Sequence, residues 1–388
     1  MPGGPAGARP HRPVRTRSIR HLIGTHNSGD SVPSTDPFVE ASLPPLPPQA
    51  EDVAWPTAHW PAGELQAVDL QSVHDLVDRA FTDQPRDDLA LTLAVVIIQG
   101  GRLVLERYGP ETDADTPLVS WSMAKSITHA AMGPLVGDGR VDPDGAATVA
   151  EWADPADPRS AISTADLLAM RSGLHWVEDY VDPDASTCLA MLFGAERADM
   201  AHFAASLPLE DPVGSNFVYS SGTTNILSRM IGDAVGGNEA AMRRHLHEVV
   251  FGPLGMASAE PRFDKAGTFV GSSYVWATAR DFARFGHWYL RDGVWDGQRL
   301  LPEGWVDRAR RLQSVDPDDD AVGYGEQWWV KVGSELGVFW ASGYEGQSIT
   351  VIPGADTVIV RLGKTPIEHA PALQAWRWDL LKALTGTG

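Results

Sequence analysis

Ser122-Met123-Ala124-Lys125 opens a stretch of small residues that is predicted to be a helix running to Leu135. A serine and a lysine three positions apart lie on one face of a helix, one turn from each other. The lysine amine is then within reach of the serine hydroxyl, which needs a neighbouring base to become a nucleophile at neutral pH. The chain has five lysines, and only Lys125 follows a serine by three residues. One short motif is weak evidence, so its surroundings must decide.

The composition predicts a globular protein that acts on small molecules. The chain has 388 residues, 43% of them hydrophobic, which is enough for a sizeable core in one to three domains. Its formal net charge is −20, and residues 1–22 contain five arginines and no acid, so the remainder is more acidic still. Such a surface repels nucleic acid and anionic membranes and favours neutral or cationic substrates.

Cysteine usage and hydropathy narrow the class of protein. Cys188 is the only cysteine, which excludes a disulfide within the chain and a cysteine-rich metal site. No run of 18 apolar residues could span a membrane. The arginine-rich start lacks the apolar region of a secretory signal. We therefore expect a cytoplasmic protein that does not bind membranes.

Predicted strands lie near both ends of the chain, and predicted helices lie between them. Residues 1–55 are rich in Pro, Gly, Ser and Arg and are expected to be disordered. Alternation and turn residues predict strands at Leu91–Ile98, Leu103–Tyr108, Glu326–Val332, Leu336–Trp340, Ser348–Ile352 and Thr357–Leu362, the first two joined as a hairpin through Gln99-Gly100-Gly101. Further helices are predicted at Leu65–Phe81, Thr164–Met170, Asp199–Ser206, Thr223–Val235, Glu239–Val250, Ala279–Leu290 and Pro366–Leu384.

This order predicts an α+β fold. Strands from both termini form one antiparallel sheet of five or more strands, and the terminal helices cover one of its faces. The sheet domain is expected to comprise residues 56–118 and 291–388, and a helical domain, residues 119–290, carries the nucleophile. The cleft between the two is the natural place for an active site.

Two further segments supply groups that a serine nucleophile needs. Tyr219 precedes a predicted helix, and a phenolate beside the lysine ammonium is stabilised and can act as a general base. Ser342, Gly343 and Tyr344 end a predicted strand with small residues, where backbone N–H groups can approach a ligand. One such N–H and the N–H of the nucleophile would make an oxyanion hole. Taken alone, the tyrosine also fits a packed core residue and the strand end an ordinary turn.

Five motifs in this order resemble the serine β-lactamase-related family, which includes class C β-lactamases, DD-peptidases, esterases and 6-aminohexanoate-dimer (nylon-oligomer) hydrolases. They are Ser122-Met123-Ala124-Lys125, Ser172-Gly173-Leu174, Tyr219-Ser220-Ser221, Ala277–Gly286 and Ser342–Gln347. The likeness runs from about residue 65 to 385. It implies that Ser122 is acylated, that Lys125 activates it, and that Tyr219 is the general base and later the proton donor. It also implies an oxyanion hole from the N–H groups of Ser122 and Tyr344, with no metal or organic cofactor.

The departures from the family pattern bear on the substrate. Class C enzymes and peptidases have asparagine where this chain has Ser221, and their Lys-Thr-Gly becomes Ala341-Ser342-Gly343, which removes a lysine that attracts a substrate carboxylate. Both changes resemble the esterase and nylon-oligomer hydrolase branch. In that branch a tyrosine contacts the substrate amide, and Tyr180 is its counterpart here. The branch's aspartate for the substrate amine has no clear counterpart before Glu196.

Four interpretations stay open. The first is a serine hydrolase that cleaves small esters or amides, closest to a carboxylesterase. A 6-aminohexanoate-oligomer amidase is the second, favoured by Tyr180, and a β-lactamase or DD-peptidase is the third, disfavoured by Ala341. The fourth is a ligand-binding module without turnover, which the intact Ser122, Lys125 and Tyr219 oppose. The sequence leaves open whether the chain forms a homodimer.

Overall fold

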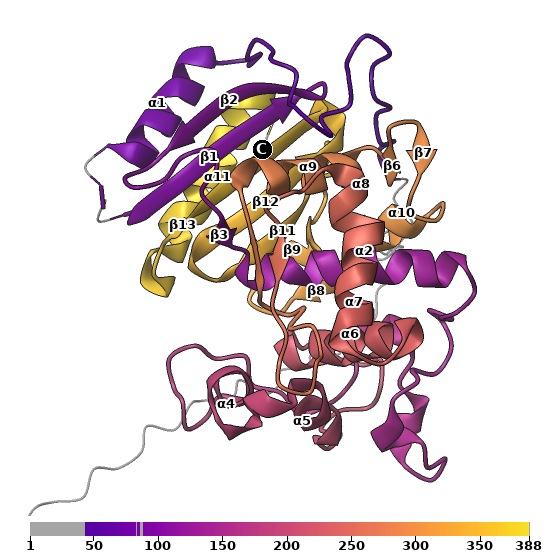
Figure 1. Cartoon of the computed structure of the whole chain (residues 1–388). Helices are drawn as coiled ribbons and strands as arrows, with labels where there is room; N and C mark the ends of the chain where they lie inside the picture. Colours follow the sequence, from indigo (N-terminus) through magenta and orange to yellow (C-terminus); the bar gives the residue numbers. More distant parts are fainter. Residues whose placement is uncertain (1–42, 83, 86–87, 388) are drawn as a thin grey trace, which may run out of the picture. The chain divides into compact units, whose positions relative to one another are not determined.

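Two apolar runs from opposite ends of the chain pair inside the main sheet (Figure 1). Strand β1 (Leu91–Gln99) lies antiparallel to β13 (Thr357–Lys364), with Ile97 opposite Ile359. The structure is a computed structural model that describes residues 43–82, 84–85 and 88–387, and these belong to one compact unit. The pairing confirms the prediction that both ends of the chain build one sheet.

Among the described residues, eight strands form this antiparallel sheet in the order β2-β1-β13-β12-β11-β10-β9-β8. The remaining members are β2 (Arg102–Tyr108), β8 (Ser314–Asp316), β9 (Asp319–Tyr324), β10 (Trp329–Lys331), β11 (Phe339–Gly343) and β12 (Gln347–Ile352). Two small sheets complete the strands. One has the order β3 (Leu118–Val119), β5 (Val275–Ala277), β4 (Glu260–Pro261), and the other pairs β6 (Val294–Trp295) with β7 (Gln298–Arg299). The hairpin β8–β9 was not predicted, because its acidic, exposed tip hides the alternation of a strand.

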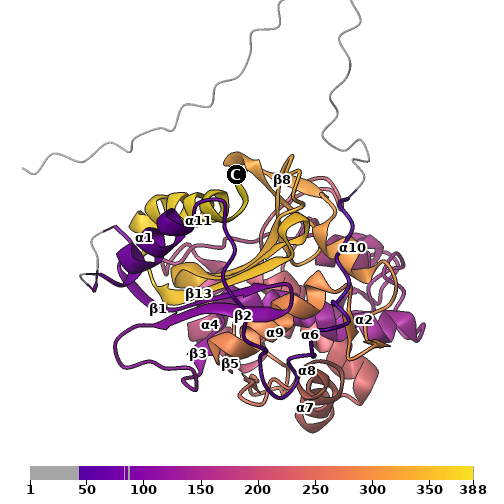
Figure 2. The same cartoon turned by 90° about the horizontal axis from the view of Figure 1, so that it is seen from above.

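Helices from both ends of the chain cover one face of the sheet (Figure 2). They are α1 (Leu70–Phe81) and α11 (Ala370–Thr385). Val77, Trp376 and Leu380 pack with Ile97 in one buried cluster. Helix α1 begins at Leu70 rather than at Leu65, because the Asp69 carboxylate accepts a hydrogen bond from the Ser72 N–H and caps the helix there.

Helix α9 (Ala279–Leu290) packs against the opposite face of the sheet. A Cβ at Gly286 would lie 2.5 Å from the Ile349 side chain and 2.7 Å from that of Val358. Glycine at this position therefore lets α9 approach β12 and β13 closely.

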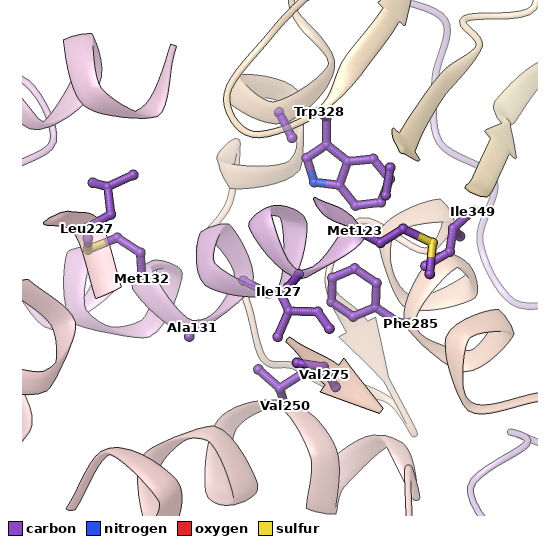
Figure 3. Close-up of a cluster of buried hydrophobic side chains, with 14 of the residues drawn as sticks. Met123, Ile127, Ala131, Met132, Leu227, Val250, Val275, Phe285, Trp328 and Ile349 are labelled. Carbon is purple, nitrogen blue, oxygen red and sulfur yellow. The ribbon is translucent and has the colours of Figure 1, made fainter. Parts of the chain in front are cut away.

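Most residues of helix α2 (Ala124–Gly137) are buried, and this helix holds the Ser122 motif in position. Figure 3 shows Met123, Ile127 and Ala131 among side chains from α9 and the sheet, including Phe285 and Ile349. Dense packing at its first turn fixes the position of Ser122 relative to the sheet.

The remaining helices lie around α2, some of them on its side away from the sheet (Figure 1). They are α3 (Thr164–Leu168), α4 (Thr187–Phe193), α5 (Met200–Ser206), α6 (Ser221–Val235), α7 (Glu239–Leu246), α8 (Gly252–Leu254) and α10 (Trp305–Arg310), of which α4, α8 and α10 were not predicted. The predicted helix Glu239–Val250 changes at His247 to a π-helix that ends at Phe251. Within the part of the chain that the structure describes, no helix is both long enough and apolar enough to cross a membrane.

The segment 43–55, part of the leader expected to be disordered, follows a defined path without helix or strand. The Gln49 amide oxygen lies 2.9 Å from His287 Nε2 and accepts a hydrogen bond from Arg291 Nε at 2.9 Å, and Val53 is buried. Residues 1–42 lie outside the described residues. The boundaries of the sheet and helical domains stay a prediction.

Candidate active site

Ser122 lies in a tight turn immediately before α2. The turn is a 3-10 helix, Trp121–Met123, in which Trp121 has a φ of 42°, a left-handed conformation that is costly for a residue with a side chain. Ser122 is 8% exposed and lines a cavity of about 320 Å³. The turn thus presents the hydroxyl to a cavity while its backbone is held against the core.

Lys125 brings its amine to that hydroxyl. Its Nζ lies 3.1 Å from Ser122 Oγ and 3.0 Å from Ser221 Oγ, and it donates to the Ser272 carbonyl oxygen at 3.1 Å. Burial of the amine lowers the pKa of Lys125, while the negative charge of Glu178 opposes that shift. A lowered pKa makes the neutral amine, the form that accepts a proton, more accessible than it is for an ordinary lysine.

Tyr219 lies beside Ser122 and Lys125. Lys125 Nζ is 4.7 Å from the centre of its ring, and the ring packs at 5.1 Å from that of Trp329. Burial and the charge of Glu178 raise the pKa of Tyr219, while a hydrogen bond with Ser122 lowers it by less. The phenol therefore keeps its proton at neutral pH, and the phenolate expected from a neighbouring lysine charge is not the resting form.

Glu178 is a member of the site that the sequence analysis missed. Its Oε1 accepts hydrogen bonds from Ser221 Oγ at 2.6 Å and the Tyr180 hydroxyl at 2.7 Å. Its Oε2 accepts from the Ser221 N–H at 2.8 Å and Trp176 Nε1 at 2.5 Å. A continuous chain of hydrogen bonds thus runs from the Glu178 carboxylate through Ser221 and Lys125 to the nucleophile. The one signal in the sequence was Ser221 in place of the family's asparagine, since a hydroxyl there needs an acceptor.

Two tyrosines form an aromatic wall of the cavity. The rings of Tyr180 and Tyr344 are 4.9 Å apart, and Tyr344 meets Trp121 edge-on at 5.7 Å. Burial and the neighbouring Glu178 raise the pKa of Tyr180, so its hydroxyl stays a donor. Ser342 and Gly343 line the same cavity. The structure therefore brings all eight candidate residues to one place, with Ser221 reaching the nucleophile through Lys125.

Comparison with known proteins identifies the family. Residues 77–384 match the family model described as Beta-lactamase. The chain belongs to this family. It is 28% identical over 297 residues to the 6-aminohexanoate-dimer hydrolase of Paenarthrobacter ureafaciens, covering 71% of this chain and 73% of that protein.

Solved structures of low sequence identity share the family fold. A protein from Bacillus anthracis described as a 6-aminohexanoate-dimer hydrolase superposes with a TM-score of 0.69 at 22% identity, over 87% of this chain and 89% of that one. A penicillin-binding protein from Bacillus halodurans gives a TM-score of 0.61 at 16% identity, over 79% and 99% of the two chains. These likenesses confirm the predicted fold class.

In this member of the Beta-lactamase family, Ala341 precedes the cavity residues Ser342 and Gly343 on β11. Ala341 is 1% exposed and belongs to the main core cluster. A methyl group packed in the core offers no charge to a substrate.

Within the described residues, no cluster of three or more His, Cys, Asp and Glu side chains could hold a metal ion.

If the N–H groups of Ser122 and Tyr344 form the predicted oxyanion hole, replacing Gly343 with alanine is expected to lower kcat for a short-chain ester about a hundredfold, the effect of losing one oxyanion donor. A Cβ there would lie 2.3 Å from the Ser120 carbonyl oxygen and 3.2 Å from the Ser122 nitrogen, so β11 must move away from the nucleophile turn. Gly232→Ala in α6 is the control, because a Cβ there meets no atom within 4 Å. Steady-state kinetics measure both, and a Gly343→Ala enzyme with unchanged kcat would show that this close approach is dispensable.

Proposed function

We propose that this protein is a serine hydrolase that cleaves small esters, and more slowly amides, through an acyl-enzyme on Ser122. The observation that carries the proposal is the buried Lys125 amine 3.1 Å from Ser122 Oγ, with its pKa lowered by burial. An amine in that state can take the proton of the serine hydroxyl as the oxygen attacks a carbonyl carbon. Membership of the Beta-lactamase family supports this chemistry.

The reaction is proposed to run in two steps. In the first, Ser122 Oγ attacks the carbonyl, Lys125 takes its proton, and the N–H groups of Ser122 and Tyr344 stabilise the oxyanion. The leaving alkoxide or amine takes a proton from the Tyr219 phenol. Lys125 then gives Tyr219 the proton that it had taken from Ser122. In the second, water attacks the acyl-enzyme with the same groups in reversed roles.

An amide substrate is the second candidate. The 28% identical relative is a 6-aminohexanoate-dimer hydrolase, and Tyr180 lines the cavity here. Esters come first because their leaving group departs without the full protonation that an amine requires. A β-lactamase or DD-peptidase activity is less well supported, because Ala341 replaces the lysine of the sheet edge. A cytoplasmic location and a homodimer stay predictions.

A panel of substrates tests the proposal. The purified full chain is assayed in parallel with 4-nitrophenyl esters of two to eight carbons, a cephalosporin and the 6-aminohexanoate dimer, and a fluorophosphonate probe is mapped by mass spectrometry. We expect ester turnover to exceed the other two and the probe to label Ser122. A protein inert to all three classes and unlabelled at Ser122 would refute the proposal.

Replacing Glu178 with glutamine is expected to lower kcat ten- to about a hundredfold, the effect of a slightly misplaced catalytic group. The Glu178 carboxylate now accepts hydrogen bonds from its neighbours. The NH₂ group of a glutamine amide is itself a donor, so it cannot accept from them. Because the charge of Glu178 raises the pKa of Lys125, its removal lowers that pKa. The neutral amine then persists to lower pH, so the acid limb of the kcat–pH profile shifts to lower pH.

The control for this variant is Glu210→Gln, because Glu210 is an exposed carboxylate that pairs with His175 at the surface. It should leave both kcat and the profile unchanged. An acid limb that moves to higher pH in Glu178→Gln would contradict the assignment of Lys125 as the proton acceptor.

A further inference from the structure

Trp121 and Glu345 both have a left-handed backbone, and each lies next to a proposed oxyanion donor. Trp121 directly precedes Ser122 and has a φ of 42°. Glu345 directly follows Tyr344, in the turn Tyr344–Gly346 after β11, and has a φ of 60°. This conformation is costly for a residue with a side chain, and it persists where the surrounding structure holds it in place. The strain at both positions indicates that the two side chains make contacts that hold it.

The side chains of these two residues join the turns that carry the donors. Trp121 Nε1 donates a hydrogen bond to Glu345 Oε2 at 3.3 Å. The Trp121 ring also meets the Tyr344 ring edge-on, with 5.7 Å between the ring centres. A Cβ at Gly343 would lie 3.2 Å from the Ser122 nitrogen, so the backbone before the second turn lies close to the first. The hydrogen bond therefore ties the turn before α2 to the turn after β11.

The backbone of the second turn is anchored separately to the sheet. The Glu345 carbonyl oxygen accepts hydrogen bonds from Arg361 Nη1 and from the Thr365 N–H, both at 3.0 Å. Arg361 is buried in β13, and its Nη1 also donates to the Gly346 carbonyl oxygen at 3.2 Å. These bonds hold the turn on the sheet. The Glu345 side chain is thereby left to join this turn to Trp121.

We propose that the Trp121–Glu345 hydrogen bond sets the separation of the two oxyanion donors, so that both side chains are positioning residues. Each acts through the N–H next to it in the chain, that of Ser122 or that of Tyr344. An oxyanion hole stabilises charge when its donors are held in place before the reaction, and a small misplacement lowers the rate. This role rests on the proposed hydrolase function and adds two residues to its machinery.

The hydrogen bond, and not the charge of Glu345, is what the proposed reaction uses. Glu345 lines the same cavity as Ser122. A negative charge near a developing oxyanion repels it and raises the energy of the transition state. Glutamine in place of Glu345 keeps an oxygen that can accept from the indole N–H and removes the charge. Variants of Glu345 can therefore separate the two contributions.

A double-mutant cycle on the full chain tests the coupling of the two residues. Trp121→Phe keeps an aromatic ring and removes the N–H, and Glu345→Ala removes the acceptor. We expect each to lower kcat/KM for 4-nitrophenyl butyrate at least about tenfold, as for a misplaced donor. The double variant should be no slower than the slower single variant, because all three lose the same hydrogen bond. Trp60→Phe is the control that keeps the wild-type rate, since Trp60 Nε1 donates at the same length, 3.3 Å, to the Arg280 carbonyl oxygen.

Two further variants of Glu345 separate the hydrogen bond from the charge and from the backbone. Glu345→Gln should match or exceed the wild-type kcat/KM. Glu345→Gly relieves the strain, because glycine adopts a positive φ freely, yet it should be as slow as Glu345→Ala. Butyl trifluoromethyl ketone forms a tetrahedral adduct with a serine nucleophile and so imitates the transition state. Its Ki should rise in the slow variants by the factor by which kcat/KM falls.

Four outcomes would overturn the positioning role: the effects of the single variants multiply in the double variant, Glu345→Gln is as slow as Glu345→Ala, Glu345→Gly is as fast as the wild type, or the Ki stays constant while kcat/KM falls. In each case a wild type that hydrolyses esters and is labelled at Ser122 leaves the hydrolase proposal standing. A wild type that is inert and unlabelled refutes the hydrolase and this role together. If Glu345→Ala does not fold, Glu345→Gly takes its place in the cycle.

Discussion

Ser122→Ala is expected to lower kcat/KM for 4-nitrophenyl butyrate at least about ten-thousandfold, because removing the nucleophile of an acyl-transfer enzyme leaves only the contribution of the oxyanion hole and substrate binding. Labelling by a fluorophosphonate should disappear at the same time. The free energy of unfolding should change by about 1 kcal/mol at most, since the variant loses one hydroxyl at the edge of a cavity. Steady-state kinetics, mass spectrometry and urea denaturation give the three readings.

The matched control is Ser120→Ala two residues earlier. Ser120 is fully buried, and its hydroxyl accepts from the Val275 N–H at 3.0 Å. We expect this variant to lose stability and to retain labelling at Ser122. A Ser122→Ala protein that still forms a covalent adduct and hydrolyses esters would place the nucleophile elsewhere.

Lys125→Met is expected to lower kcat about a thousandfold, within the range for loss of a general base. Methionine keeps much of the length of the side chain and cannot accept a proton. In the wild type, kcat should rise with pH as Lys125 loses its proton, and this limb should be absent from the variant. Lys125→Arg should be equally slow, because a guanidinium stays protonated throughout the range.

The pH dependence of stability is an independent test of the lowered pKa of Lys125. The pKa of Lys125 is lower in the folded protein than its ordinary value of 10.5, so the unfolded chain binds more protons between the two values. Wild-type stability therefore falls as the pH falls through this window, and the variant lacks that loss. Urea denaturation at several pH values up to 10.5 should show Lys125→Met gaining stability relative to the wild type as the pH falls below 10.5. An opposite trend would mean that the folded state holds Lys125 charged.

The parts of the fold and site that could be predicted from the sequence are those encoded by nearby residues. Ser122 and Lys125 are one helical turn apart, and the strands β1 and β13 are apolar runs bounded by turn residues. The contribution of Glu178 depends on how the loop between Trp176 and α4 folds back onto Ser221, which no local pattern specifies.

The pairing of β1 with β13 has a consequence for synthesis on the ribosome. Strand β1 leaves the ribosome long before β13, and until then the edge that it offers to β13 has no partner. Exposed apolar edges of this kind invite pairing between chains. Tyr344, which lines the cavity beside Ser122, also belongs to the late part of the chain. A nascent chain that already contains Ser122 therefore lacks this side of the cavity, and chaperone binding during translation should concentrate on β1.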